Sequence, residues 1–528
     1  MASKQDKSNQ RLKSAPSSSS VMLRAASKVG GWTMISRILG FVRDIFLARV
    51  LGAGVLADAF FVAFKLPNFF RRMFAEGTLT VALVPVLSEL RQQGEPEAHS
   101  FLDALATLLL LAVLLFTLLG MLFMPWLLYL FAPGFADEPE RWQMALELAR
   151  WMFPYLAMIS LTAMGWAVLN TYKNFAVPAA TPALLNVAII FAAVVLAPLF
   201  DNPTIALAIG ILIGGALQLL IQFPALKRIG WVPRISFDFK QAAIGETLRL
   251  FAPALLAIAA VQINILVGTI LATLLDTGAV SYLYYADRIV QLPLALFGIA
   301  MSTALLPTLA GHLARGDQGA ALDDLRAGLA WLTWLTLPAV VGAFYLAEPI
   351  VVTLFERGAF THADSMATAQ TLQAYAVGLL AFCWVRLLAS ACYAGKDAKA
   401  PMQYAALSVA VNIILALVLM QYWAYVGLAL ATSLAAFVNA LLLILRLRKT
   451  YGSIVDAKSA RRMLTAMLAS LLMYGALLGL SELWLFPQHD WLMQALWLTA
   501  AVAGGAVVFL LSALILGEKA LLQGLRKR

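Results

Sequence analysis

Apolar stretches long enough to cross a membrane recur along this chain from residue 30 almost to its last residues. A helix needs about 20 residues to cross a hydrocarbon core of about 30 Å, and these stretches reach that length. Unpaired backbone amides and carbonyls are too costly in lipid, so a spanning segment must be a helix or a strand of a closed barrel. Continuous apolar runs lack the alternation of barrel strands. The sequence therefore predicts an all-α polytopic membrane protein.

Hydropathy predicts fourteen transmembrane helices, with no hydrophilic segment between them that could fold as a sizeable soluble domain. Only 12% of the residues are charged, against roughly a quarter in soluble globular proteins, so lipid is the main surrounding of the chain. The predicted spans cover residues 31–52, 55–88, 101–130, 143–169, 178–199, 204–226, 245–275, 279–311, 322–354, 366–393, 401–421, 423–446, 460–484 and 489–516.

The basic residues of the chain indicate its topology. The formal net charge is +10, and the excess lies largely in the two tails and in alternate short connections, while the intervening turns are almost free of Lys and Arg. Arg141 and Arg357 are the exceptions. Because Lys and Arg collect in cytosolic loops, we expect both termini in the cytosol and no nucleic-acid partner. Residues 1–28, which start with a Ser-, Lys- and Gln-rich stretch, are predicted to form a disordered cytosolic tail.

A weak internal repeat divides the spans into two groups. A shift of 221 residues aligns Leu207-Ala208 with Leu428-Ala429, and the basic pair Lys227-Arg228 with Arg448-Lys449. Six spans separate the copies, and an even number preserves orientation, so we expect two parallel repeats. After the tail, the predicted organisation is a six-helix bundle at 29–228, a second at 229–450, and two further helices with a basic C-tail at 451–528. Chance similarity between Leu- and Ala-rich helices is the alternative.

Charged side chains gather inside the predicted spans, where a charge costs a few kcal/mol unless it faces a cavity or a partner. The first span carries Arg37, Arg43 and Asp44, and the eighth carries Asp287 and Arg288. The second span, which contains Pro67, carries a longer series of polar residues: Asp58, Lys65, Asn68, Arg71, Arg72 and Glu76.

Two interpretations of these charges are open. Arg72 and Glu76 have the i, i+4 spacing of a structural ion pair, and Asp44 and Asp287 each have an adjacent arginine to neutralise. The arginines as a group outnumber the acids available to them, and a guanidinium suits bidentate recognition of phosphate. We therefore predict that an anionic substrate binds four arginines in one central, water-filled cavity: Arg37, Arg43, Arg71 and Arg288.

The sequence lacks the common motifs of catalysis and cofactor binding. It contains no Walker A loop, nucleophile elbow or HExxH zinc motif, and its four histidines lack ligand spacing. Cys383 and Cys392 lie nine positions apart on one predicted helix, which places them on opposite faces without metal-ligand spacing. We therefore expect a transporter rather than an enzyme, with no cofactor and no bound metal.

Three runs of residues carry a resemblance to a known family. They read SRILGFVRD at 36–44, ADAFFVAFKLPN at 57–68 and RRMFAEG at 71–77, and APGF at 132–135 and YYADR at 284–288 extend the likeness. With these runs the chain resembles the MurJ (MviN) lipid II flippases, a branch of the multidrug/oligosaccharidyl-lipid/polysaccharide exporter superfamily. The resemblance covers nearly the whole chain.

The resemblance implies a function and a location. Members of this family move lipid II, an undecaprenyl-pyrophosphate-linked disaccharide pentapeptide, from the inner to the outer leaflet of the bacterial inner membrane for peptidoglycan synthesis and cell shape. Alternating access is implied, with lipid II and membrane lipids as partners and peptidoglycan synthases as further candidates. We expect the prenyl tail of the substrate to stay in lipid, in an apolar groove formed by the last two spans.

The resemblance also assigns site residues. The arginines that match the family's cavity arginines are Arg37, Arg43, Arg71 and Arg288, and the other matching polar positions are Asp58, Lys65, Asn68 and Glu76. Gln291 stands where some relatives have an acid. Some relatives also coordinate sodium with carboxylates on spans seven and eleven, where this chain has Gln262, Asn264 and Asn412. The energy source therefore stays open.

Three alternatives to a lipid II flippase stay open. A flippase for another polyprenyl-linked saccharide, or a drug exporter, would have the same fold, although drug cations favour acids rather than arginines. A membrane enzyme that uses a lipid-linked donor needs a positioned base or metal-binding acids near a membrane surface, and no loop here is large enough for such a site. A purely structural scaffold leaves the cationic interior unexplained.

Overall fold

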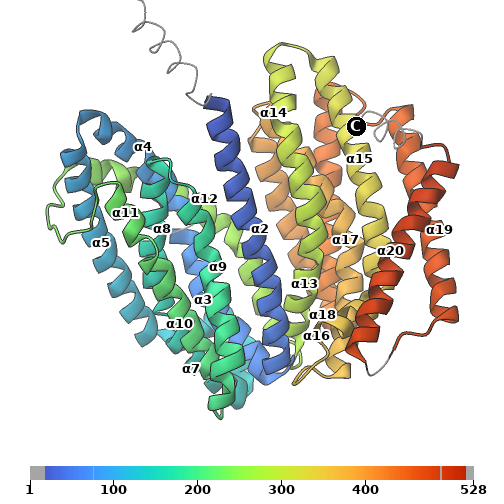
Figure 1. Ribbon diagram of the computed structural model, residues 1–528, viewed down its shortest axis with the longest axis horizontal. Coiled ribbons are helices and arrows are strands. Elements are labelled where there is room, and N and C mark those ends of the chain that lie inside the picture. The colour runs from blue at the N-terminus through green and yellow to red at the C-terminus, as the bar shows by residue number, and fades with distance from the viewer. Residues whose placement is uncertain (1–17, 75–76, 488–489, 519–528) are drawn as a thin grey trace, which may run out of the picture. The chain divides into compact units, whose positions relative to one another are not determined.

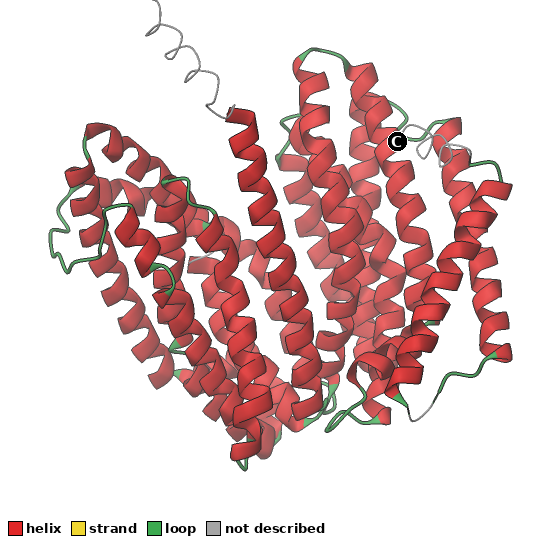
Figure 2. Ribbon diagram, viewed as in Figure 1, coloured by secondary structure: helices red, strands yellow, loops and turns green. Residues whose placement is uncertain are grey.

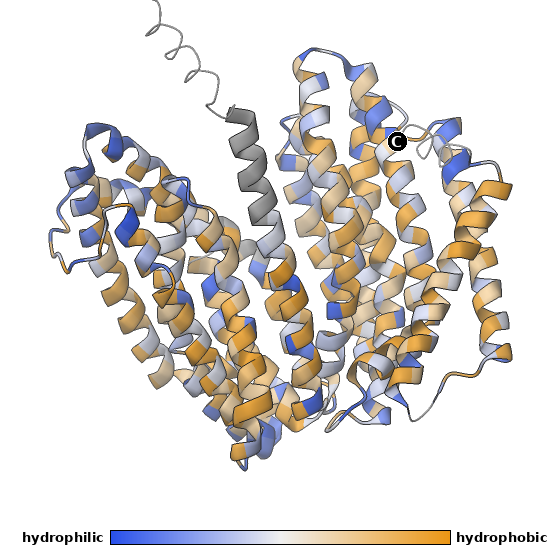
Figure 3. Ribbon diagram, viewed as in Figure 1, coloured by the Kyte–Doolittle hydropathy of each residue, from blue (hydrophilic) through white to orange (hydrophobic). Residues whose placement is uncertain are grey.

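The computed structural model describes residues 18–74, 77–487 and 490–518, and throughout them the regular elements are helices (Figure 2). The prediction of an all-α membrane protein is confirmed. Apolar residues run along the helices, and hydrophilic residues gather at turns such as that between α14 (Ala300–Ala314) and α15 (Gln318–Tyr345) (Figure 3). This distribution suits helices whose sides face lipid and whose ends face water.

The helices are labelled in Figure 1. Those of the first half of the chain are α2 (Ser18–Leu51), α3 (Val55–Phe74), α4 (Thr78–Gln93), α5 (Glu95–Leu122), α6 (Met124–Phe131), α7 (Pro139–Met152), α8 (Tyr155–Thr171), α9 (Ala176–Phe191), α10 (Pro203–Leu220) and α11 (Phe223–Arg228). Those of the second half, besides α14 and α15, are α12 (Ala242–Thr273), α13 (Ala279–Pro293), α16 (Ala347–Phe355), α17 (His362–Ala394), α18 (Lys399–Tyr451), α19 (Ala457–Leu483) and α20 (Trp491–Ile515). Short 3-10 or π turns are η1 (Pro133–Asp137), η2 (Ala192–Leu196), η3 (Ala197–Leu199) and η4 (Leu294–Ile299).

Among the described residues, eleven helices are long and apolar enough to cross a membrane. Helix α18 counts once among them although it covers two predicted spans, and its backbone leaves helical geometry at Trp423 and Ala424, the start of the second of these spans. Helices α2 and α12 are not among the eleven, although each overlaps a predicted span. The figure of fourteen spans therefore stays a prediction. Helix α2 begins at Ser18, inside the predicted tail 1–28, and residues 1–17 lie outside the described part.

Two compact units make up the chain, and neither is one continuous segment. One contains residues 1–50, 62–130 and 143–263, and the other contains residues 51–61, 131–142 and 264–528. The predicted parallel repeats, with their boundary after residue 228, stay a prediction. Two short segments from the first half of the chain, residues 51–61 and 131–142, thus pack within the second unit.

Each unit has its own hydrophobic core. In the first, apolar side chains of α4, α5 and α8 pack together, including Leu83, Phe101 and Val168. In the second, α17 packs against α13, α15 and α18. Helices α19 and α20 join this unit through a core that includes Trp334 of α15 and Trp497 of α20. Cys383 and Cys392, both on α17, are free thiols, and both are buried.

Close packing between α17 and α18 depends on Gly378. A Cβ atom added at this position would lie 2.5 Å from the Oγ of Ser433 and 2.7 Å from its Cα. In the structure the Ser433 hydroxyl donates a hydrogen bond of 2.8 Å to the Ala374 carbonyl, one turn before Gly378. The backbones of the two helices therefore approach as in other small-residue contacts between membrane helices.

We expect the substitution Gly378→Ala to lower the free energy of unfolding by about 1–3 kcal/mol, because the new methyl group forces the two helices apart. Equilibrium unfolding in mixed detergent micelles measures this loss. The matched control is Gly475→Ala on α19, where an added Cβ meets no atom within 4 Å. Equal stability of the two variants would show that the contact at Gly378 is not tight.

Candidate functional site

Arg43, on α2, forms an ion pair with its neighbour in sequence. Its Nε and Nη2 atoms donate hydrogen bonds of 3.0 and 2.6 Å to Oδ1 of Asp44. Both residues are buried, and both were predicted to lie inside the first span. Of the two interpretations of Asp44, neutralisation of its neighbour is thus the one that the structure supports. The pair lowers the cost of burying either charge.

Asn186, on α9, holds the other side of the Arg43 guanidinium. Its side-chain oxygen accepts a hydrogen bond of 3.0 Å from Nη1 of Arg43, and its Nδ2 donates one of 3.0 Å to the Ser36 carbonyl. Asn186 therefore ties α9 to α2 and fixes the plane of the guanidinium. The sequence analysis missed this residue. The available signal was a single amide in the otherwise apolar second half of α9, since polar side chains inside membrane helices commonly bind a neighbouring helix.

On α3, two of the predicted site residues contact one another. Asn68 donates to the Phe64 carbonyl at 2.7 Å and accepts from Nε of Arg71 at 3.1 Å. The i, i+3 spacing places both side chains on one face of the helix. Lys65, on the same helix, is half-buried, and Arg37 of α2 is exposed. Glu76, and with it the predicted pair with Arg72, lies outside the described residues.

Arg288, on α13, contacts Tyr284 and Gln291 of the same helix. Its Nη2 donates to the Tyr284 hydroxyl at 3.2 Å, its guanidinium lies 4.7 Å from the centre of that ring, and its Nη1 lies 3.5 Å from the Gln291 side-chain oxygen. Tyr284 in turn stacks on Phe61 with ring centres 3.9 Å apart. Gln291 also donates to the carboxylate of Asp287. The amide that departs from the family pattern therefore bridges the two charged residues of this helix.

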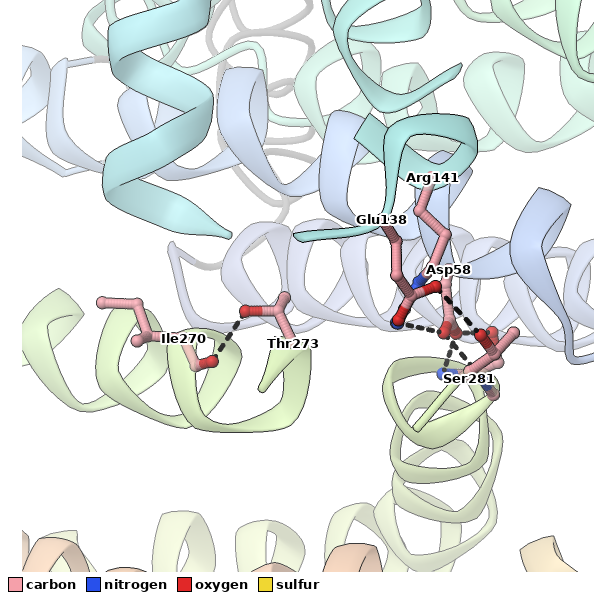
Figure 4. A network of polar contacts seen from close by, with 8 residues as sticks. Asp58, Glu138, Arg141, Ile270, Thr273 and Ser281 are labelled. Carbon is pink, nitrogen blue, oxygen red and sulfur yellow. Dashed lines mark hydrogen bonds and ion pairs between the residues drawn. The ribbon is translucent and has the colours of Figure 1, made fainter. Parts of the chain in front are cut away.

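Asp58, on α3, lies in a buried network of polar contacts. It is 0% exposed, and one carboxylate oxygen accepts from the Gly278 amide at 2.8 Å and from Nη2 of Arg141 at 3.1 Å. The other oxygen accepts from the amide and the hydroxyl of Ser281 at 2.9 and 2.5 Å (Figure 4). Arg141, also 0% exposed, donates at 2.6 Å to Glu138 as well. The carboxylate thus caps the N-terminus of α13 and neutralises a buried arginine.

The predicted site residues fall into two groups by unit. Those of the first unit are Arg37, Arg43, Lys65, Asn68 and Arg71, and those of the second are Asp58 and Arg288. Between α12 and α18, Nδ2 of Asn412 donates to the Asn264 side-chain oxygen at 3.1 Å. Among the residues that the structure describes, no group of three or more His, Cys, Asp or Glu side chains could hold a metal ion.

We expect Asp58→Ala to lower the free energy of unfolding by about 3–5 kcal/mol, because Arg141 loses a buried carboxylate and α13 loses its cap. Ser281→Ala removes a single hydroxyl donor, so we expect a loss of about 1 kcal/mol. Unfolding in mixed micelles measures both. Asp201→Ala, in an exposed turn, is the control. A loss for Asp58→Ala no larger than that of the control would contradict the role of the buried pair.

Comparisons with known proteins bear on the whole chain. The family model of the lipid II flippase MurJ matches residues 47–500. The chain is similar to the probable lipid II flippase MurJ of Haemophilus influenzae, with 37% identity over 92% of this chain and 98% of the relative. It is also similar to that of Vibrio cholerae, with 36% identity over 94% of this chain and 97% of the relative.

Solved structures agree with these relatives. A structure of the lipid II flippase MurJ in an inward closed conformation has a TM-score of 0.78 and 28% identity, over 93% of this chain and 99% of that one. An inward-facing multidrug transporter of the MATE family, at 13% identity and a TM-score of 0.64 over 80% of this chain and 98% of that one, shares the fold alone. From the family model and the relatives together, the chain belongs to the MurJ lipid II flippase family.

Proposed function

We propose that this chain is a flippase that moves lipid II from the inner to the outer leaflet of the bacterial cytoplasmic membrane by alternating access. Membership in the MurJ family supports the assignment of the chain as a flippase and of lipid II as its substrate. In this proposal both termini lie in the cytosol, and lipid II and membrane lipids are the partners, with peptidoglycan synthases as further candidates. The observation that carries the proposal is the set of arginines on the membrane helices α2, α3 and α13.

The chemistry of the head group explains why arginines suit this task. A pyrophosphate carries multiple negative charges and cannot enter hydrocarbon without partners that replace its water. A guanidinium offers paired N–H donors that match two phosphate oxygens, and such charge-assisted bonds are roughly twice as strong as neutral ones. In the proposed site the pyrophosphate binds these donors as it crosses the membrane: those of Arg37, Arg43, Arg71 and Arg288.

Contacts of the arginines with neighbouring side chains support the proposed binding role. Asn68 orients Arg71, and Tyr284 and Gln291 orient Arg288. These contacts hold each guanidinium in a defined direction. A preorganised cation loses less entropy when an anion binds. We propose that Lys65 and Asn68 complete the polar lining, and that Asp58 contributes indirectly by holding α13, which carries Arg288.

Transport also requires release, so the affinity for the head group must differ between the inward-facing and outward-facing states. A site that bound the pyrophosphate equally in both states would not shift the equilibrium between them.

We expect each of Arg37→Ala, Arg43→Ala, Arg71→Ala and Arg288→Ala to reduce lipid II flipping about tenfold or more, because each loses a charge-assisted bond of about 1.5–3 kcal/mol. The lysine variants keep the charge but lose the bidentate fork, so we expect intermediate activity. Flipping is measured in cells depleted of their own flippase, as lipid II on each leaflet at equal protein levels. Arg315→Ala, in the exposed α14–α15 turn, is the control. Wild-type flipping by all four alanine variants would overturn the proposal.

Asn186 gives a second, independent prediction. We expect Asn186→Leu to weaken the apparent affinity for lipid II, because the Arg43 guanidinium loses the oxygen that fixes its plane, and Asn186→Gln to restore part of it. Titration of purified protein with lipid II measures the affinity. In an Arg43→Ala background, Asn186→Leu is expected to add no further loss. Additive losses in the double variant would show that Asn186 acts elsewhere.

A further inference from the structure

A connection without helix or strand follows α11 and is fixed to the side of α5. We call residues 231–241 the strap. The Trp231 indole donates to Oδ1 of Asp103 at 2.8 Å, and the Arg234 amide donates to the same oxygen at 3.0 Å. The Ser236 amide then donates to Oγ1 of Thr107 at 2.9 Å. These three bonds belong to one unit of the chain and hold the strap in a defined position on α5.

The strap runs along α5 and returns. Its start is bound at Asp103, its middle at Thr107, and its last residue, Gln241, contacts Ser100 at 3.2 Å. At a rise of about 1.5 Å per residue, Thr107 lies about 6 Å further along the helix than Asp103. The strap therefore has a tip at residues 235–238, beside the position on α5 where its polar residues end and a run of leucines begins.

Two large apolar side chains at this tip are exposed to the surroundings. Ile235 is 75% exposed and Phe237 is 69% exposed, although the backbone between them is bound to Thr107. On α5 itself, exposed leucines begin four residues after Thr107, at Leu111. The tip thus lies level with the start of the lipid-facing part of a membrane helix. Aromatic and aliphatic side chains at that depth suit the boundary between head groups and acyl chains.

Exposed basic residues lie on the strap and immediately before it in the sequence. Lys227 and Arg228 end α11, and Arg234 and Lys240 lie on the strap itself. Asp238 is the one acid between residues 227 and 241, and its carboxylate accepts a hydrogen bond from Gln241 at 3.1 Å. The four cations outnumber the two carboxylates at the strap, those of Asp238 and Asp103, which both already accept hydrogen bonds, and they favour a negatively charged partner. The large exposed side chains at the tip are apolar, and four neighbouring exposed side chains are basic. The strap therefore suits an anionic phospholipid, which has apolar acyl chains and a negatively charged phosphate.

We propose that the strap is an interfacial anchor that binds anionic phospholipids: Ile235 and Phe237 enter the membrane interface, and the four basic residues bind lipid phosphates. The strap contains none of the arginines proposed to bind the substrate. The proposal depends on α5 spanning the membrane and not on the identity of the substrate. The Ser236 amide binds α5, while the side chains of Ile235 and Phe237 on either side of it stay exposed for lipid.

The depth of the tip is tested with the full chain in lipid nanodiscs that contain phosphatidylglycerol. In a variant whose two buried native cysteines are replaced by alanine, a nitroxide is attached at Phe237→Cys, and its collisions with oxygen and with a water-soluble nickel chelate are measured. Reference labels are Leu118→Cys on the exposed face of α5 and Asp201→Cys in a turn. We expect an intermediate depth for Phe237→Cys. Chelate access equal to that at Asp201→Cys, or shielding from both reagents as under a covering protein, would overturn the proposal.

The charge of the anchor is tested by native mass spectrometry of the protein with phosphatidylglycerol or phosphatidylcholine. Neutralising all four residues, as Lys227→Gln, Arg228→Gln, Arg234→Gln and Lys240→Gln, is expected to weaken phosphatidylglycerol binding about tenfold and to leave phosphatidylcholine binding unchanged. The matched control neutralises four other exposed basic residues: Lys399, Arg448, Lys449 and Lys458. If both quadruple variants lost phosphatidylglycerol binding equally, the effect would be one of overall charge, and the proposed site would be wrong. Size-exclusion profiles confirm that each variant is folded.

Discussion

The free-energy cost of an unpaired polar group in hydrocarbon constrains both the backbone and the side chains of this protein. It requires the backbone to be helical, because only then do the amides and carbonyls of a single spanning segment satisfy one another. It then applies to side chains, which must find partners or water once they enter a span. Asp58 shows the consequence most clearly, since its two oxygens take four donors in a place with no exposure. Without such compensation, neither Asp58 nor Arg141 could be buried.

Two classes of membrane arginine follow from this constraint. Arg141 is fully buried and is neutralised by acids, so it contributes to the fold and has little capacity to bind an incoming anion. Arg71 and Arg288 remain partly accessible and are oriented by amides and a phenol. Arg43 lies between the two classes, with Asp44 on one edge of its guanidinium and Asn186 on another. Full burial and ion pairing thus mark Arg141 as a structural charge, whereas Arg71 and Arg288 stay partly accessible, as the proposed binding role requires.

The sequence predicted the features that depend on local pattern. Apolar run length predicted the helices, and the position of charges within those runs predicted which helices carry the arginines. Contacts between distant residues could not be predicted, because spacing says nothing of partners 83 or 143 positions away, as for Asp58 with Arg141 and Arg43 with Asn186. Arg141 and Arg357 stood out only as exceptions to the loop-charge pattern. The structure explains both, since Arg141 is paired to Asp58 and Arg357 donates to the Thr353 carbonyl and lies over the Trp491 ring.

In the proposed function, the ion pair between Arg43 and Asp44 bears on how a highly charged substrate is released after it binds. An arginine already paired with a carboxylate exchanges one anion for another when phosphate arrives, so much of the new attraction is offset by the pair that it replaces. Binding at such a site is weaker than at an arginine with neutral partners, and departure is correspondingly easier because the carboxylate can reclaim the guanidinium. In the proposed function, the pyrophosphate therefore binds Arg43 at a site from which Asp44 can displace it again, which is what transit rather than storage requires.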